Sequence, residues 1–242
     1  MRRILASLLI GVAISGVSGW AQPSTPTGVA DPATYLAEFS AAAQVTWPKN
    51  RTLTLVCHGH SVPAGYFKTP DVRPLESYPH LLRVELAQRF PHAVINVIVT
   101  AIGGENAEQG AARFEQDVLS LRPDVVLLDY ALNDRGAGLV PAAEAWRAMI
   151  GAAQARGIEV LLLTPTPDTA ANWREPGDAL QQHAAQVRAL AAERGVGLVD
   201  SLAAFERFVS EGGQITAVMA QRNHPNASGH ALVAREIARW FP

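Results

Sequence analysis

The stretch Leu53-Thr-Leu-Val-Cys57, followed by His58-Gly59-His60-Ser61, decides the fold of this chain. A continuous apolar run that ends in glycine and serine is typical of a strand buried on both faces of a sheet. Such a strand needs further strands beside it and helices over it. The polar residues at its carboxyl end predict a turn that brings side chains to the edge of that sheet.

Similar apolar runs alternate with helical patterns along the rest of the chain. Further strands are predicted at residues 93–100, 124–130, 158–163 and 196–200. Helices are predicted at residues 77–90, 107–121, 141–156, 178–194 and 226–240. Apolar strands separated by helices indicate a parallel sheet, and right-handed crossovers leave few topologies. The predicted fold is α/β: a doubly wound, mostly parallel five-stranded sheet with helices on both faces, a flavodoxin-like three-layer sandwich.

The amino-acid composition is that of an ordinary globular protein, and the charge balance argues against nucleic acid as a partner. The chain has 242 residues, 48% hydrophobic and 17% charged, which fits one domain with at most a short appendage. The formal net charge is -2 without a basic tract, so nucleic acid is not expected as a partner. Cys57 is the only cysteine and lies in an apolar run, so we expect a buried thiol and no intramolecular disulfide.

The N-terminus has the pattern of an export signal. Arg2 and Arg3 precede an apolar run over residues 4–17, and Gly19-Trp20-Ala21 offers small residues for a cleavage site. We therefore expect residues 1–21 to be a secretory signal peptide and the protein to be secreted or periplasmic. An uncleaved membrane anchor is the alternative, which the short apolar run disfavours.

Three segments are expected after and including this signal. The signal at residues 1–21 is followed by a linker over residues 22–50, and the main domain occupies residues 51–242. Asp31 as N-cap and Pro32 at the first helical position predict a short helix within the linker. No membrane association is expected once the signal is removed.

Chemistry-bearing residues follow each predicted strand. Ligands bind doubly wound sheets at the carboxyl ends of the strands, so these residues are the candidates for a functional site. They are Ser61 after the first strand, Gly104 after the second, Asn133 after the third, Asp168 after the fourth and His224 after the fifth. A serine hydroxyl attacks a carbonyl only when a neighbouring base takes its proton, so Ser61 and His224 suggest a nucleophile and a base.

These segments resemble the SGNH (GDSL-like) hydrolase family, named for a serine, a glycine, an asparagine and a histidine in four sequence blocks. Ser61, Gly104, Asn133 and His224 match them in order, and the resemblance makes residues 51–242 an SGNH-hydrolase-like domain. It implies that an oxyanion is bound by the backbone N–H groups of Ser61 and Gly104 and by the Asn133 amide. The larger α/β-hydrolase fold is disfavoured because Pro63 stands where the second glycine of its Gly-x-Ser-x-Gly turn is required.

Three positions depart from the family pattern. His60 stands where the family carries an aspartate before the nucleophile, and Ala131 where its third block begins with glycine. Gln221 stands where the family carries the aspartate of a catalytic triad. Because a carboxylate normally orients the imidazole and stabilises its charged form, the last change matters most.

Three arrangements around His224 stay open. Ser61 and His224 could form a dyad in which the Gln221 side-chain oxygen, or a backbone carbonyl, orients the ring. A carboxylate from Asp200 or Glu206 could replace the missing aspartate. Alternatively, the site could be a weak or inactive relic that still binds ligand.

Other polar residues carry weaker expectations. His58 and His60 resemble paired metal ligands of amidohydrolases, but that fold is a (β/α)₈ barrel of typically about 250 residues, and only five strands are predicted here. Metal catalysis is therefore disfavoured, and neither a metal nor a cofactor is expected. His183 and His230 are expected on helix surfaces.

The loops beyond the strand ends are expected to form the substrate pocket. Tyr66 and Trp173 are the candidates for its rim. Asp134 is expected to be a structural hydrogen-bonding residue. Arg135 is expected either to contact an acidic group of a substrate or to be solvated.

The resemblance implies an exported serine esterase. Ser61 would form an acyl-enzyme that water hydrolyses with His224 as general base. Exported relatives often remove acetyl groups from carbohydrates, so the expected partner is a small-molecule or carbohydrate ester, short-chain or O-acetyl. A lipid esterase or thioesterase, or a catalytically weak ligand-binding relative, is the alternative. The oligomeric state is left open by the sequence.

Overall fold

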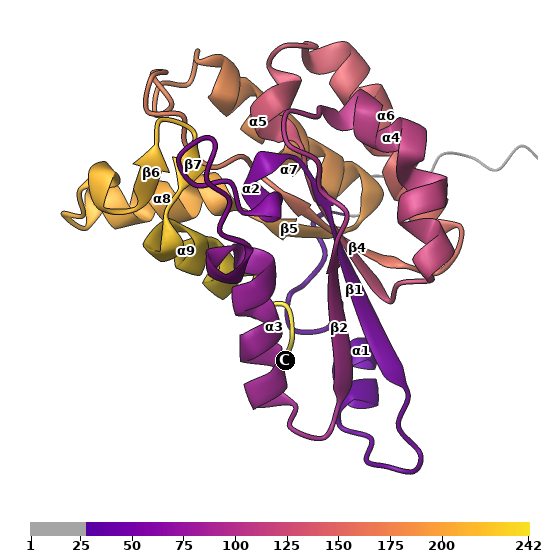
Figure 1. Cartoon of the computed structure of the whole chain (residues 1–242). Coiled ribbons are helices and arrows are strands. Elements are labelled where there is room, and N and C mark those ends of the chain that lie inside the picture. The colour runs from indigo at the N-terminus through magenta and orange to yellow at the C-terminus, as the bar shows by residue number, and fades with distance from the viewer. Residues whose placement is uncertain (1–27) are drawn as a thin grey trace, which may run out of the picture.

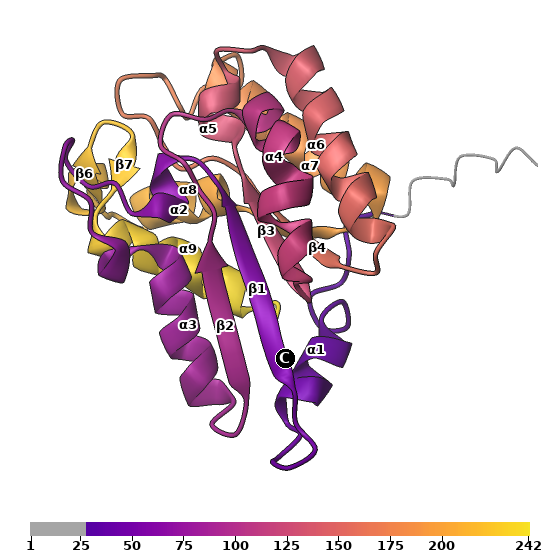
Figure 2. The same ribbon diagram turned by 45° about the vertical axis from the view of Figure 1, so that its right-hand side comes forward.

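Five strands form a single parallel sheet in the order β2-β1-β3-β4-β5 (Figures 1 and 2). The computed structural model describes residues 28–242, so the expected signal peptide lies outside the described residues. The strands are β1 (Thr52–Gly59), β2 (Val94–Val99), β3 (Val125–Asp129), β4 (Glu159–Leu163) and β5 (Gly197–Val199). Every neighbouring pair is parallel, which confirms the predicted sheet.

The central strands are apolar throughout because each contributes to two cores. Successive side chains of a strand point to opposite faces of the sheet. Leu127 of β3 belongs to the core on one face, whereas Val126 and Leu128 belong to the core on the other. All three are fully buried, so a polar residue at any of these positions would lose its contact with water.

Helices cover both faces of the sheet. On one face lie α3 (Tyr78–Arg89), α8 (Ser201–Ser210) and α9 (Ala227–Ala238) (Figure 1). On the other lie α4 (Ala107–Asp117) and α6 (Leu139–Gln154), while α7 (Ala179–Arg194) contributes side chains to both cores (Figure 2). This is the predicted three-layer arrangement.

The N-terminal segment is attached to the domain. α1 (Ala37–Ala43) starts later than predicted, because a turn that begins at Asp31 precedes it and the Asp31 carboxylate accepts only the Ala33 N–H. Leu36 and Phe39 are buried in the main core. None of the helices in residues 28–242 has the length and apolar character needed to cross a membrane.

Several short elements were not predicted. They are α2 (Ser61–Ala64), α5 (Ala131–Asp134), the helix α8, the hairpin of β6 (Met219–Gln221) and β7 (His224–Pro225), and three 3₁₀ turns, η1 (Pro74–Glu76), η2 (Leu119–Leu121) and η3 (Ile215–Ala217). α2 and α5 immediately follow β1 and β3. They and the hairpin carry the residues for which a functional role was predicted.

Candidate active site

Ser61 is the first residue of α2, the one-turn helix that follows β1. His60 caps this helix: its Nδ1 accepts the N–H of Val62 at 3.2 Å. Gly65 ends it with φ of 88°, a conformation that favours glycine. The turn is thereby fixed at both ends, and it holds the 7% exposed Ser61 at the carboxyl edge of the sheet.

The β6–β7 hairpin positions His224. The two strands are antiparallel, with Gln221 paired to His224, and Asn226 then caps the first turn of α9. The Nε2 atom of His224 lies 2.9 Å from the Oγ atom of Ser61. The fold thus brings together the two residues that the sequence suggests as base and nucleophile, although 163 positions separate them.

Gln221 contacts the other ring nitrogen of His224, but not through the atom that was expected. Its Nε2 lies 2.7 Å from His224 Nδ1, while its oxygen accepts the N–H of Thr69 at 3.1 Å. The carbonyl oxygen of Phe67 also lies 3.3 Å from Nδ1. In this arrangement the Gln221 amide nitrogen faces the ring, and the Phe67 carbonyl is the acceptor close to Nδ1.

These neighbours decide which nitrogen of His224 carries the proton. When Gln221 Nε2 donates to Nδ1, the imidazole proton is on Nε2, and this tautomer cannot take a proton from Ser61. When Nδ1 carries the proton, it donates to the Phe67 carbonyl, and Nε2 accepts the Ser61 hydroxyl. In that second state the amide of Gln221 has to turn so that its oxygen faces the ring. The second state is the one that can act as a base.

Burial keeps His224 neutral. Loss of hydration is the main cause that lowers the pKa of its imidazole below the ordinary value, and the nearby His60 adds to it. The hydrogen bond to the Phe67 carbonyl acts in the opposite direction, since it favours the protonated ring. A neutral imidazole is the form that a general base requires.

Three hydrogen-bond donors surround the Ser61 side chain, from α2, α5 and the loop after β2. Within residues 28–242, the backbone N–H groups of Ser61 and Gly104 have no acceptor. The Asn133 amide donates to the carbonyl of Glu105 at 2.8 Å, which ties α5 to the loop after β2. That loop is held beside β1 by the Ile102 N–H, which donates to Gly59 at 3.0 Å. Free N–H groups at a sheet edge are suited to bind an oxyanion.

His60 takes part in a buried polar cluster beneath Ser61. Its Nε2 lies 3.4 Å from the Asp129 carboxylate at the end of β3, and the Tyr78 hydroxyl donates to the same carboxylate at 3.2 Å. All three side chains are at most 2% exposed. Burial raises the pKa of Tyr78, which keeps the phenol protonated as a donor. His60 thus joins the nucleophile turn to β3, and Asp129 is a member of the site that the sequence reasoning missed.

Asp168 anchors the hairpin that carries His224. Its buried carboxylate lies 2.9 Å from Arg135 and 3.4 Å from Arg222. The N–H of Thr169 donates to the Arg222 carbonyl at 2.7 Å. Arg135 is half-buried and pairs with this carboxylate, so it is not simply solvated. The position of Asp168 after a strand end was the available signal for this role.

Asp134 has the expected structural role. Its carboxylate accepts the N–H of Ala107 and the indole N–H of Trp146, each at 2.7 Å, and thereby joins α5 to α4 and α6. Burial raises the pKa of Asp134 to about 6.

Three expectations about exposure are wrong. His183 and His230 are each 3% exposed, and Trp173 is 7% exposed and belongs to the main core rather than to a pocket rim. His230 is buried because its Nδ1 accepts the N–H of Tyr78 at 3.3 Å, where it joins α9 to α3. Tyr66 does lie at the site: its ring centroid is 5.9 Å from that of His224.

The alternative carboxylates are engaged elsewhere. Asp200 pairs with Arg188 at 2.7 Å and caps α8, and Glu206 accepts a hydrogen bond from Gln181 at 2.5 Å. Both are thus held by partners other than His224, and the contacts of the His224 ring are those described above.

The metal-site alternative is not supported by the position of His58. Its Nδ1 lies 2.8 Å from the Thr100 hydroxyl and its Nε2 lies 3.1 Å from the Gly110 carbonyl, so both nitrogens are engaged by protein atoms. Burial lowers the pKa of His58 to about 4. Across residues 28–242, no group of three histidine, cysteine, aspartate or glutamate side chains is arranged as a set of metal ligands.

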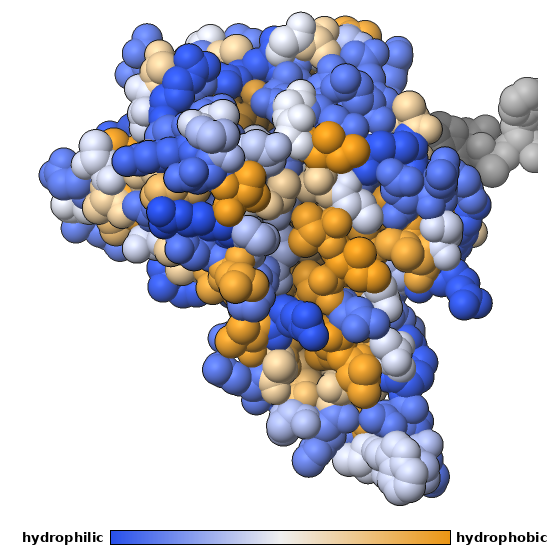
Figure 3. All heavy atoms as spheres, in the orientation of Figure 1, coloured by the Kyte–Doolittle hydropathy of each residue, from blue (hydrophilic) through white to orange (hydrophobic). Residues whose placement is uncertain are grey.

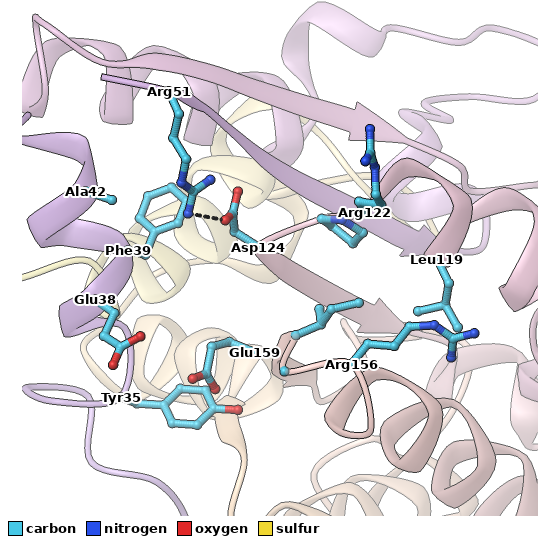
Figure 4. Close-up of a pocket in the computed structure, with 13 residues that line it drawn as sticks. Tyr35, Glu38, Phe39, Ala42, Arg51, Leu119, Arg122, Asp124, Arg156 and Glu159 are labelled. Atoms are coloured by element: carbon cyan, nitrogen blue, oxygen red, sulfur yellow. Dashed lines mark ion pairs between the residues drawn. The ribbon is translucent and has the colours of Figure 1, made fainter. Parts of the chain in front are cut away.

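The larger cavities lie away from the dyad. One of about 730 Å³ opens between α1 and the amino ends of β3 and β4, where Arg51 pairs with Asp124 at 2.6 Å (Figure 4). A second, of about 710 Å³, lies between α3 and α9. Neither is lined by Ser61 or His224, so neither is the acyl pocket of a substrate bound at Ser61.

A three-layer α/β fold with a Ser–His pair and free N–H donors at the carboxyl edge defines a class of serine hydrolases. The chain belongs to the GDSL-like lipase/acylhydrolase family, whose profile matches residues 57–232. It is therefore an enzyme that hydrolyses ester bonds. A search of the curated proteins found no match.

Solved structures with this fold include several esterases. Axe2, an acetylxylan esterase from Geobacillus stearothermophilus, is 23% identical with a TM-score of 0.68, over 78% of this chain and 94% of that chain. LAE5, an alpha/beta hydrolase from the metagenome of Lake Arreo, has the same identity, TM-score and coverage. CEX, a two-domain esterase active on acetylated mannans, is 22% identical with a TM-score of 0.69, over 86% of this chain and 52% of that chain.

Proposed function

We propose that this protein is an exported serine esterase that removes short acyl groups, acetyl above all, from a carbohydrate. The observation that carries the proposal is the 2.9 Å contact between Ser61 Oγ and His224 Nε2, next to free backbone N–H groups. In the base-competent tautomer, His224 takes the serine proton as Ser61 attacks the ester carbonyl. The Phe67 carbonyl, in place of a carboxylate, orients the ring.

The oxyanion that forms is bound by the N–H groups of Ser61 and Gly104 and by the Asn133 amide. Each such donor typically contributes on the order of 10²–10³ to the rate. His224 then protonates the leaving alcohol, and water hydrolyses the acyl-enzyme with His224 again as base.

The substrate class rests on two supports. Two of the esterases with this fold act on acetylated xylan and on acetylated mannans, and the activities of these two enzymes motivate the choice of a carbohydrate ester. The larger cavities of residues 28–242 are not lined by the dyad, which favours a small acyl group over a long one. Export rests on the N-terminal pattern of Arg2, Arg3 and the apolar run that follows.

Hydrolysis of 4-nitrophenyl acetate and of an acetylated xylo-oligosaccharide tests the proposal. We expect Ser61→Ala and His224→Ala to lose at least about 10³ in kcat/KM. Ser40→Ala is the matched control, since Ser40 is also a buried serine but lies on α1. Full activity of Ser61→Ala would contradict the serine mechanism. Faster turnover of long-chain esters or thioesters than of acetates would indicate the lipid alternative.

A further inference from the structure

The edge strand β2 combines an apolar surface with an unpaired backbone. β2 pairs with β1 alone. Val94 and Val99 are 51% and 43% exposed, and Ile102 just beyond the strand is 48% exposed. Figure 3 shows apolar surface over β2, where Figure 1 places the strand. An edge of this kind is a template for another strand.

Backbone hydrogen bonds show which groups of β2 face outward. The N–H of Thr100 donates to Cys57 and that of Ile102 to Gly59, each at 3.0 Å. Along a strand, residues whose backbone N–H and C=O groups point to one neighbouring strand alternate with residues whose groups point to the other side. The N–H and C=O groups of Ile95, Val97 and Val99 therefore point away from β1. Within the described part of the chain, none of these three N–H groups has an acceptor.

β2 also lacks the features that normally prevent edge pairing. Its sequence, Val-Ile-Asn-Val-Ile-Val, contains no charge and no proline, and its register with β1 is regular throughout. The opposite edge differs. β5 has only three residues, and the carbonyl of Val196 just before it accepts the N–H of Ala30 at 3.2 Å. One edge is thus short and partly covered, whereas the other is long and open.

We propose that β2 pairs antiparallel with β2 of a second copy of this chain, which gives a dimer with one continuous sheet. The two-fold axis passes midway between Val97 and the partner's Val97. Val97 then lies opposite the partner's Val97, and Ile95 lies opposite the partner's Val99. These are the residues whose N–H and C=O groups face outward, so each pair exchanges two N–H···O bonds.

A second copy fits this edge because the strand is complementary to itself. Antiparallel pairing about Val97 sets Asn96 opposite the partner's Ile98 and brings no like charges together. Open clefts of about 310 and 500 Å³ flank the strand, one lined by Leu75 and Val97, the other by Ile98 and Leu121. When the partner's β2 is added to the sheet, its apolar side chains cover both clefts.

Sedimentation of the mature protein tests the dimer. Wild type sediments as a dimer at micromolar concentration, and Val99→Lys sediments as a monomer, because the lysine would be buried against the partner's Ile95. Val140→Lys is the control: Val140 is 71% exposed but lies on α6, and this variant stays dimeric. A monomeric wild type, or a Val99→Lys variant that keeps the wild-type dimer, overturns the proposal.

A cross-link tests the register independently of the lysine variant. Residues opposite each other in a hydrogen-bonded antiparallel pair have Cα atoms about 5.5 Å apart, which is within reach of a disulfide. Val97→Cys therefore forms an intermolecular disulfide on mild oxidation, whereas Val140→Cys does not. The native Cys57 is fully buried and does not compete. A Val97→Cys variant that cross-links no faster than Val140→Cys overturns the proposed axis.

Discussion

In the proposed mechanism, Gln221 both contacts His224 and hinders its action as a base. Its Nε2 lies 2.7 Å from His224 Nδ1, and this contact favours the tautomer that cannot accept the serine proton. Replacement of a triad aspartate by its amide in a serine protease costs about 10⁴ in rate for this reason. The base-competent tautomer here depends on the Phe67 carbonyl at 3.3 Å, a longer and uncharged contact.

Gln221→Glu should therefore raise activity. The variant keeps the side-chain length but presents an acceptor to Nδ1–H, so we expect kcat/KM on 4-nitrophenyl acetate to rise by about tenfold or more. The carboxylate also favours the protonated ring, so it raises the pKa of His224. Activity is lost as pH falls through that pKa, and the acid limb of the pH profile should move to higher pH than in wild type.

The wild-type profile gives the reference for this shift. Because burial lowers the pKa of His224, the wild-type acid limb should lie below the ordinary histidine value of about 6.5. Unchanged or reduced kcat/KM in Gln221→Glu, with correct folding by circular dichroism, would mean that the glutamine amide has a positive role of its own.

His60 and Asp129 are buried neighbours at another position that departs from the family, although their contact is too long or too poorly aligned for a hydrogen bond. His60 Nε2 lies 3.4 Å from the Asp129 carboxylate, and neither side chain is more than 2% exposed. An aspartate at position 60, the residue of the family, would face a second buried carboxylate. The departure at position 60 thus has a local explanation in the buried carboxylate of Asp129.

We expect His60→Asp to destabilise the protein by about 3 kcal/mol, because it leaves like charges buried together. The double variant His60→Asp with Asp129→Asn should recover part of this loss. Urea unfolding of wild type, both single variants and the double variant gives the coupling free energy. A coupling near zero would contradict a direct interaction between the two side chains.

The candidate site was predictable at the residues that match a sequence motif, whereas Asp129 and the Phe67 carbonyl were missed. Ser61, Gly104, Asn133 and His224 stand out in sequence because each follows a strand or precedes a helix. The Phe67 carbonyl has no sequence signal, since every residue carries one. Gln221 was identified as the residue beside His224, but the orientation of its amide depends on the Thr69 N–H, a contact across 152 positions.

At the scale of elements, Asp134 fixes the relative positions of three helices. Its two carboxylate oxygens accept the Ala107 N–H at the start of α4 and the Trp146 indole N–H of α6, each at 2.7 Å. Asn133, the neighbouring residue in α5, donates to the loop after β2. The position of the candidate oxyanion donor therefore depends on this carboxylate.

Asp134→Asn should lower the free energy of unfolding by about 2 kcal/mol at pH 7. The amide has one acceptor oxygen instead of two, so one of the two buried N–H groups loses its partner. Asp117→Asn on α4 is the control. Its carboxylate is 35% exposed and pairs with Arg113, which keeps its second partner Glu105, so stability should change by less than about 1 kcal/mol. Equal losses in both variants, measured by urea unfolding, would contradict the role of Asp134.

The elements that could be predicted are those whose pattern is local. All five strands of the sheet fall within two residues of their predicted starts, because each is an apolar run of uniform character. The helix α8 was missed although Asp200 caps it. The apolar pattern of this helix begins directly after β5, with no loop to separate the two elements in the sequence. The β6–β7 hairpin was missed because its two short strands carry no alternating apolar pattern of their own.

At the scale of the whole molecule, burial of ionisable groups sets the pH range in which the fold is stable. His58 and His230 are neutral inside the protein, and burial lowers the pKa of each to about 4. Asp134 acts in the opposite direction, since burial raises its pKa to about 6. These three groups lie in different parts of the fold and join strands to helices or helices to one another.

The protein should lose stability as the pH falls from 7 to 5. In the unfolded chain the two histidines take up protons near pH 6.5, whereas in the folded protein they do so only near pH 4, so acid favours the unfolded state between these values. Protonation of Asp134 in the folded protein offsets part of this loss below pH 6. The expected net loss at pH 5 is about 2 kcal/mol, which lowers the thermal midpoint by several degrees.

Thermal unfolding of wild type and of His230→Asn at pH 7 and pH 5 measures this effect. The asparagine does not titrate, and its side-chain oxygen can accept a hydrogen bond as the imidazole does from the Tyr78 N–H. The variant should be less stable than wild type at pH 7 because a smaller side chain leaves a gap between α9 and α3. Its midpoint should nevertheless fall less between pH 7 and pH 5, since the group at position 230 no longer binds a proton on unfolding. An equal fall in both proteins would mean that His230 is not the neutral, buried group that joins these two helices.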